Sequence, residues 1–279
     1  MAFSGMDTTF LAAGAVAATT VGLSKGGLPI IGMLAVPVLS LAIPAPEAAG
    51  LLLPIYVVSD VFGIIAYRRA YDRRNLAILV PAGIAGIAAG WAIFWFLTRG
   101  PGIAALAQTL GIHGVDIGAD AARRGSERAV TLLVGCIGLA FCLNIWLQRG
   151  RTVAARPADI PRGLFWGAIA GFTSFVSHAG APPYQMYALP QKMEKMVFAG
   201  TSTILFAIIN AAKLPPYWHL GMLSIDSLEA MLPLFPVAIA ATYAGVALTR
   251  ILPQELFYRL VTGALLLVSV KLCFDGILG

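Results

Sequence analysis

Three stretches of the chain, 75–98, 129–148 and 230–249, contain no charged side chain. Each is close to the roughly 20 residues that an α-helix needs to cross the hydrocarbon core of a bilayer. Only 11% of all residues are charged and 59% are hydrophobic, against about 25% charged in an average soluble domain. Because water cannot solvate a surface so poor in charge, we expect an all-α polytopic membrane protein covered by lipid.

Two kinds of apolar segment alternate along the chain. The longer ones are expected to span the membrane, and they cover 47–67, 75–97, 129–147, 196–213, 228–249 and 257–275. The shorter arms cover 8–24, 28–43, 163–177 and 181–191. An arm of eleven residues rises only about 16 Å as a helix. We therefore expect a broken or re-entrant helical hairpin in each half, and leave open whether the first-half arms span fully.

A short pattern, Thr-x3-Ser-x2-Gly-x-Pro, occurs at residues 20–29 and again at 173–182. It places Lys25 opposite His178 and indicates an internal repeat. The pairs that correspond farther along are Gly50 with Gly200 and Asp60 with Asn210. The expected organisation is a first repeat over 1–147 with an outer segment at 99–128, a cytoplasmic linker over 148–162, and a second repeat over 163–279.

Charge in the loops predicts how the repeats are oriented. The loops 68–74 and 149–162 are rich in arginine, which favours the cytoplasmic side. The region corresponding to 68–74 in the second half, 214–225, lacks arginine and is expected outside. The two repeats then have inverted topology, an arrangement typical of transporters with a substrate site near the midplane. Residues 213–219 are interpreted as an interfacial loop, and 99–128 as an amphipathic segment on the outer surface.

The repeated motif predicts an anion site. Glycines at each turn permit backbone conformations that strain other residues, and Pro29 and Pro182 suit the first turn of the next helix. A helix N-terminus offers free N–H groups and a partial positive charge, which together bind anions. The predicted substrate-binding residues are Ser24, Lys25, Gly26, Gly27, Ser177, His178, Ala179 and Gly180.

Several side chains near the motif have alternative interpretations. Lys25 at bilayer depth is costly, so it either binds the substrate anion, forms a structural ion pair with Asp60, or extends to the interface. His178 either couples protons to transport, since an ordinary histidine titrates near neutrality, or serves as a neutral hydrogen-bonding group. Serines in the motif either donate to an oxyanion or pack as small residues. The predicted supporting or coupling residues are Asp60, Asn210, Thr201 and Ser202.

Other classes of function have no support in the sequence. We find no His-Glu-x-x-His motif, no Gly-x-Ser-x-Gly elbow and no metal-ligand spacing, so an enzyme, a metal site and a cofactor are not expected. The net charge of +6 comes from clusters between apolar segments and does not indicate nucleic-acid binding. Without a nucleotide-binding loop, ATP is not expected to drive transport directly.

The motif residues Gly22-Leu23-Ser24-Lys25-Gly26-Gly27 and their repeat at 177–182 resemble the TauE/SafE family of sulfite exporters, also called toluene sulfonate uptake permeases. The length and hydropathy of the chain are similar as well. This resemblance implies a bacterial inner-membrane protein whose substrates are sulfite, sulfonates or related organic anions. It transfers no individual residue role to this chain.

The sequence thus predicts a secondary transporter of a small anion, with export favoured over uptake. The anion would bind between the halves, and one half would rock against the other to change access. An anion channel and a carrier of small carboxylates remain alternatives. The expected partners are the anionic substrate, lipid, protons and a second copy of the chain in a homodimer.

Overall fold

The computed structural model describes residues 8–43, 45–99, 155–223 and 225–278, and parts of 132–147. Every regular element within these residues is a helix. The elements are α1 (Thr8–Lys25), η1 (Pro29–Leu34), α2 (Ala35–Leu39), α3 (Ala45–Tyr67), α4 (Arg73–Arg99), α7 (Ile160–Ser177), α8 (Ala181–Ala188), η2 (Leu189–Gln191), α9 (Lys195–His219), α10 (Ile225–Met231), η3 (Leu232–Leu234), α11 (Phe235–Ile251) and α12 (Gln254–Leu278). The prediction of an all-α chain is confirmed for these residues.

Five of the described helices are long and apolar enough to cross a bilayer, at Glu47–Tyr67, Arg73–Trp95, Lys195–His219, Leu228–Ile251 and Gln254–Phe274. They coincide with five of the predicted spanning segments, and so confirm a multi-pass membrane protein. The sixth segment, 129–147, lies mostly outside the described residues, as does the outer segment from 100 to 128. The shorter helices α1 and α7 are not among the candidate spans.

The first pair of arms folds back on itself as a hairpin. α1 ends at Lys25, and both η1 and α2 pack against it. Between them lies the first turn, residues 26–28, where Gly27 has φ 123°. A Cβ at Gly27 would lie 2.5 Å from the Thr249 Oγ1 atom. Glycine is required there by both conformation and space.

The second pair of arms, α7 and α8, also folds into a hairpin. The second turn, residues 178–180, begins with His178 at φ 55°, a left-handed conformation that glycine usually occupies. The His178 N–H donates to the Ser174 carbonyl at 3.1 Å, and the Ala179 N–H donates to the Thr173 carbonyl at 3.2 Å. These bonds satisfy carbonyls that the end of the helix would leave unpaired.

α7 begins earlier than the sequence predicted. It starts at Ile160, inside the region 148–162 that was interpreted as a linker. The Asp159 side chain accepts a hydrogen bond from the Arg162 N–H at 3.0 Å, and Pro161 occupies the first turn. Such a capping residue followed by proline stabilises a helix start.

The interpretation of residues 213–219 as an interfacial loop is wrong. α9 continues without interruption from Lys195 to His219, although it contains Pro215 and Pro216. Lys213 and Tyr217 are fully buried on one face of this last part, and Trp218 is exposed. On that face the Tyr217 hydroxyl donates to the Phe175 carbonyl at 2.7 Å and so ties the last part of α9 to α7.

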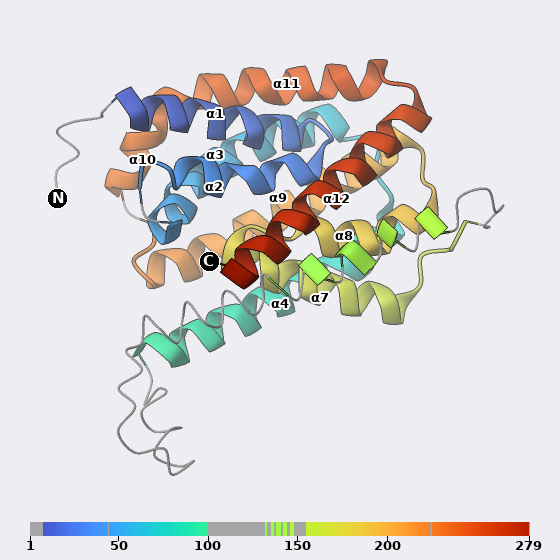
Figure 1. Ribbon diagram of the computed structural model, residues 1–279, viewed down its shortest axis with the longest axis horizontal. Coiled ribbons are helices and arrows are strands. Elements are labelled where there is room, and N and C mark those ends of the chain that lie inside the picture. The colour runs from blue at the N-terminus through green and yellow to red at the C-terminus, as the bar shows by residue number, and fades with distance from the viewer. Residues whose placement is uncertain are drawn as a thin grey trace, which may run out of the picture.

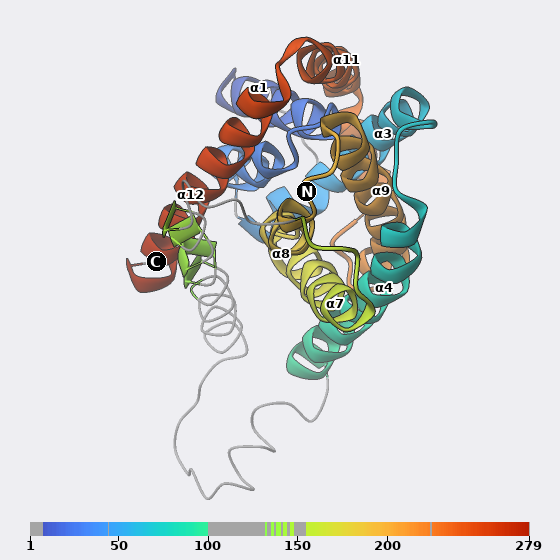
Figure 2. The same ribbon diagram turned by 90° about the vertical axis from the view of Figure 1, so that its right-hand side faces the viewer.

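Helices from the two halves of the chain pack in three pairs: α1 along α11, α4 along α7, and α3 along α9 (Figures 1 and 2). Small residues permit close approach. A Cβ on Gly22 of α1 would lie 2.3 Å from the Ala238 carbonyl oxygen, and one on Gly171 of α7 would lie 2.0 Å from that of Gly83. Each motif therefore lies against helices of the other half.

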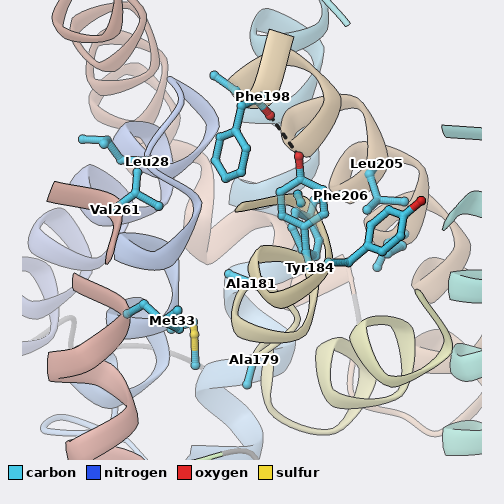
Figure 3. Close-up of a cluster of buried hydrophobic side chains, with 14 of the residues drawn as sticks. Leu28, Met33, Ala179, Ala181, Tyr184, Phe198, Leu205, Phe206 and Val261 are labelled. Carbon is cyan, nitrogen blue, oxygen red and sulfur yellow. Dashed lines mark hydrogen bonds between the residues drawn. The ribbon is translucent and has the colours of Figure 1, made fainter. Parts of the chain in front are cut away.

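The second arms of the two hairpins also meet, since η1 contacts α8. Apolar side chains that follow the two turns belong to one core cluster, and Figure 3 shows Leu28 and Met33 on one side and Ala181 and Tyr184 on the other. The Tyr184 hydroxyl donates to the Phe198 carbonyl of α9 at 3.0 Å. This cluster fixes the position of both broken helices.

Candidate functional site

A small cavity of about 30 Å³ lies where the two halves meet. Its wall comes from α1, η1 and α3 of the first half and from α7, the second turn and α9 of the second half. The residues that line it are Ser24, Lys25, Pro29, Gly32, Met33, Tyr56, Ser174, His178, Ser202, Thr203, Phe206 and Asn210. On this measure roughly 10–15 Å³ is enough to hold one water molecule, so the cavity has room for only a few waters.

Lys25 forms a buried ion pair with Asp60, with 2.7 Å between Nζ and Oδ1. Asn210 donates from Nδ2 to the other carboxylate oxygen, Oδ2, at 2.7 Å. The structural ion pair that the sequence left open is thus present. The Lys25 ammonium also lies 5.2 Å from the ring centre of Tyr56 and 5.8 Å from that of Phe206. These aromatic faces favour a cation between them.

His178 is held on three sides. Its ring stacks on Tyr56 with centroids 4.9 Å apart and planes 10° apart. Its Nε2 atom lies 3.2 Å from the Ala49 carbonyl oxygen and 3.4 Å from the Tyr217 hydroxyl. The left-handed backbone of this residue and these contacts together fix the imidazole at the cavity wall.

Lys213 is a buried amine behind His178 and Ser174. Its Nζ atom lies 3.2 Å from each of the Ser174 carbonyl oxygen, the Ser174 Oγ atom and the His178 Nδ1 atom. A carbonyl oxygen can only accept, so Nε2 carries the imidazole hydrogen and donates it to the Ala49 carbonyl. The Nδ1 atom then accepts from Lys213. This assignment follows from the partners of each nitrogen.

Two buried tyrosines support the turns in a corresponding way. The Tyr67 hydroxyl donates to the Gly26 carbonyl at 2.5 Å, and the Tyr217 hydroxyl donates to the Phe175 carbonyl at 2.7 Å. Both side chains are fully buried. They are separated by the same number of residues as Asp60 and Asn210, so extending the repeat along these helices would have found them.

The structure brings some of the predicted site residues together. Ser24, Lys25, Pro29 and Ser202 line the cavity, as do His178 and Asn210. Gly26 and Gly27 form the first turn. Asp60 is not in the cavity lining, but its carboxylate is bonded to two residues that are, Lys25 and Asn210. The Ser24 hydroxyl donates to the Val21 carbonyl at 2.7 Å.

Other predicted residues lie elsewhere. The cavity lining does not include Ser177, Ala179, Gly180, Pro182 or Thr201. Ser177 donates to the Thr173 carbonyl at 3.3 Å, and Thr201 accepts from the Asp72 N–H at 2.8 Å. Ser174, one turn before Ser177, lines the cavity instead. Sequence reasoning missed Ser174, Tyr56 and Lys213 in this region.

The two expected helix N-termini differ in what they offer. Pro29 begins the six-residue 3₁₀-helix η1 and lines the cavity. In α8, Pro182 and Pro183 lack N–H groups, and the Tyr184 N–H already donates to the Gly180 carbonyl at 3.3 Å. The second N-terminus therefore has few donors free, and the polar residues of that half that line the cavity lie on α7, the second turn and α9.

A family comparison matches the model of the sulfite exporter TauE/SafE family to residues 10–272, nearly the whole chain. The chain belongs to the TauE/SafE family of sulfite exporters. The resemblance seen in the repeated motif is confirmed. Comparisons with curated proteins and with solved structures returned no match.

Membership in the TauE/SafE family establishes the class of the molecule. Together with the five candidate spans, it makes this chain a multi-pass membrane protein of a transporter family whose name denotes sulfite export. Within the residues that the structure describes, no group of three His, Cys, Asp or Glu side chains is placed to hold a metal ion.

Proposed function

We propose that this TauE/SafE member is a secondary active transporter that exports sulfite or a small organosulfonate across the bacterial inner membrane. The observation that carries the proposal is the cavity between the halves, whose wall combines Lys25 from the first motif with His178 from the second. Hydroxyl and amide groups of Ser174, Ser202 and Asn210 line the same space. Convergent donors and buried positive charge suit an oxyanion.

Several contacts support an inverted repeat around this cavity. Asp60 and Asn210, which correspond in the sequence, hydrogen-bond to each other at 2.7 Å. A Cβ on Gly50 would lie 2.0 Å from the Met222 carbonyl oxygen beyond α9, and one on Gly200 would lie 1.8 Å from that of Ala70 beyond α3. Corresponding residues meet in this way when two similar halves pack around a common axis, as in alternating-access carriers.

The small size of the cavity favours a carrier over the alternative of an anion channel. A conducting channel requires a continuous path, whereas about 30 Å³ between packed helices holds little more than water. We infer that one half moves relative to the other to admit the substrate. Small carboxylates have the same charge and similar acceptors, so they remain the competing substrate class.

Proton coupling through His178 is part of the proposal. The imidazole lies at the cavity wall with its Nδ1 atom 3.2 Å from the Lys213 ammonium. A change in the charge of the cavity therefore acts directly on a group that can exchange a proton. If His178→Gln kept both the rate and the pH dependence of transport, this part of the proposal would be wrong.

Two further partners are proposed, the membrane lipid and a second copy of the chain. Exposed apolar side chains such as Leu267, Phe274 and Trp218 are suited to contact lipid. A homodimer is proposed from the sequence alone. Cross-linking in native membranes would test the dimer without affecting the argument for the cavity.

Counterflow in proteoliposomes tests the transport function. Vesicles that contain the purified protein are loaded with unlabelled sulfite or methanesulfonate, and a trace of labelled anion is added outside. A carrier gives transient accumulation of label above equilibrium, whereas a channel only equilibrates it. We expect accumulation for the wild type and for Lys195→Met, a lysine outside the cavity on α9.

The matched site variant is Lys25→Ala, for which we expect loss of accumulation while the protein remains monodisperse on size exclusion. The proposal fails if the wild type accumulates neither sulfur oxyanion. It also fails if small carboxylates exchange well and both sulfur oxyanions do not.

A further inference from the structure

We infer that the cavity binds its substrate as a monovalent anion, and that the buried ammonium of Lys213 supplies the one positive charge that this anion neutralises. The inference rests on the proposed transport function and specifies the charge of the substrate that the site accepts. Its basis is an inventory of every charged or titratable group that faces the cavity or contacts its wall in the described residues.

The first pair of charges cancels. Lys25 on α1 and Asp60 on α3 are both about 5% exposed at the side chain and lie 2.7 Å apart. Asn210 on α9 completes the carboxylate with a second hydrogen bond. The pair is therefore neutral as a unit, and Lys25 can direct spare donors toward the cavity without adding net charge.

His178 contributes no charge while Lys213 is an ammonium. Its Nδ1 atom faces the Lys213 Nζ atom at 3.2 Å and must accept a hydrogen bond there. A doubly protonated ring would place an N–H donor against an ammonium donor at that distance, which both charge and hydrogen bonding oppose. The imidazole is thus neutral, with its hydrogen on Nε2 directed at the Ala49 carbonyl.

The phenols near the cavity add no charge either. The Tyr56 hydroxyl donates to the Gly32 carbonyl at 2.6 Å, and the Tyr217 hydroxyl donates to the Phe175 carbonyl at 2.7 Å. Each phenol uses its hydrogen in a bond to a backbone acceptor, which requires the neutral form. Tyrosine is ordinarily neutral at physiological pH.

Lys213 is the remaining group near the cavity whose charge no other side chain in the described residues compensates. It is fully buried, and its contacts are the Ser174 carbonyl, the Ser174 hydroxyl and an imidazole nitrogen, all of which are uncharged. No ion pair to it is found in the part of the chain that the structure describes. A buried ammonium without a counter-ion is strongly unfavourable and tends to lose its proton, so an anion in the cavity is what stabilises the charged form of Lys213.

The contact with Ser174 shows how this charge reaches the substrate. The Ser174 Oγ atom accepts from the ammonium, which leaves its own hydrogen available to donate into the cavity that it lines. A chain of hydrogen bonds of this kind polarises each member. Lys213 therefore acts as a positioning residue behind the wall rather than as a direct ligand.

A net charge of one selects among sulfur oxyanions. A sulfonate or hydrogen sulfite brings one negative charge and leaves the cavity neutral. A dianion leaves one buried negative charge without a partner, unless a proton enters the site with it. The cavity should therefore prefer a monovalent over a divalent oxyanion of similar shape.

The experiment measures binding of methanesulfonate and of sulfate to the purified protein by isothermal titration calorimetry at one pH. These probes share tetrahedral sulfur and differ in charge. We expect the wild type to prefer methanesulfonate by about tenfold or more, since a single charge at close range has at least that effect. Lys213→Met, with net charge zero, should lose methanesulfonate affinity by a similar factor without loss of thermal stability.

Two further variants separate charge from structure. Asp60→Asn keeps the shape at that position and raises the net charge by one, so it should shift the preference toward sulfate. The double variant Asp60→Asn/Lys213→Met restores the wild-type charge and should regain the preference for methanesulfonate. A purely structural role for Lys213 predicts no such recovery. Lys195→Met on the same helix is the control, and should bind as the wild type does.

Distinct results would overturn the inference. It is wrong if the wild type binds sulfate as well as methanesulfonate, or if Lys213→Met keeps its affinity, even though counterflow of either anion would leave the transport function standing. If Asp60→Asn does not fold, the Lys213→Met result decides alone. Absence of binding of both probes to a folded wild type would overturn the inference and the proposed site together.

Discussion

The two turns lie in the two occurrences of the same sequence motif, yet they are built differently. The first turn uses Gly27 at φ 123° and follows Lys25, whose charge Asp60 compensates. The second turn uses His178 at φ 55°, a neutral ring backed by the buried ammonium of Lys213.

The same sequence motif therefore serves two different purposes at the two turns. The first turn places a cation beside the cavity at no net charge, and its glycine relieves the backbone. The second turn tolerates a strained non-glycine residue because the side chain is needed there, held by stacking on Tyr56 and by two bonded nitrogens. Strain of this kind persists where the surroundings over-determine a residue.

The largest expected effect concerns the two buried lysines. Lys25→Met leaves the Asp60 carboxylate buried without its cation, and breaking such a pair costs roughly 3–5 kcal/mol. Lys213→Met removes a charge that has no carboxylate partner in the described residues, so its free energy of unfolding should be unchanged or higher. Unfolding of both variants in detergent measures the contrast, and equal losses would show that the two lysines have the same structural role.

A second contrast tests the correspondence of the halves. A Cβ on Gly50 or Gly200 would meet a backbone oxygen at 2.0 Å or 1.8 Å. Each Gly→Ala change should therefore destabilise the protein by about 1–3 kcal/mol, as overpacking does. Gly263→Ala in α12 is the control, because nothing lies within 4 Å of its Cβ position, and helix propensity favours alanine there. A large loss at only one of the two glycines would argue against equivalent packing.

The smallest expected effect separates the two supporting tyrosines. Tyr217→Phe removes the hydroxyl that bonds the Phe175 carbonyl near the end of α7, and an unsatisfied buried acceptor costs about 1–3 kcal/mol. Tyr67→Phe should cost less, because Thr249 also donates to the Gly26 carbonyl, at 3.0 Å. Thermal unfolding of the two variants compares them directly, and a larger loss for Tyr67→Phe would reverse the ranking.

Much of the fold could be predicted from local composition. Segments such as 47–67 and 228–249 were found because an apolar run near the thickness of a bilayer has few other uses. The motif and its repeat also placed Lys25 and His178 in one region and suggested the Lys25–Asp60 pair. These inferences succeeded because charge is costly in the membrane and therefore informative wherever it occurs.

The site itself depended on contacts that no local pattern contains. Ser174 rather than Ser177 lines the cavity, and it is hydrogen-bonded to Lys213 of α9, a residue far from it in the chain. Lys213 resembled an interfacial residue, since two prolines and Trp218 follow it, yet packing against α7 buries it completely.

The sequence by itself determined the membrane class, the repeated motif, the family and the presence of charge at depth. Only the tertiary structure decided which charges cancel, because compensation depends on distances of a few ångströms between residues far apart in the chain. Lys25 forms an ion pair with Asp60, whereas Lys213 contacts the imidazole of His178 and the side chain and carbonyl of Ser174. That difference in partners, invisible to composition and spacing, gives the cavity its net charge.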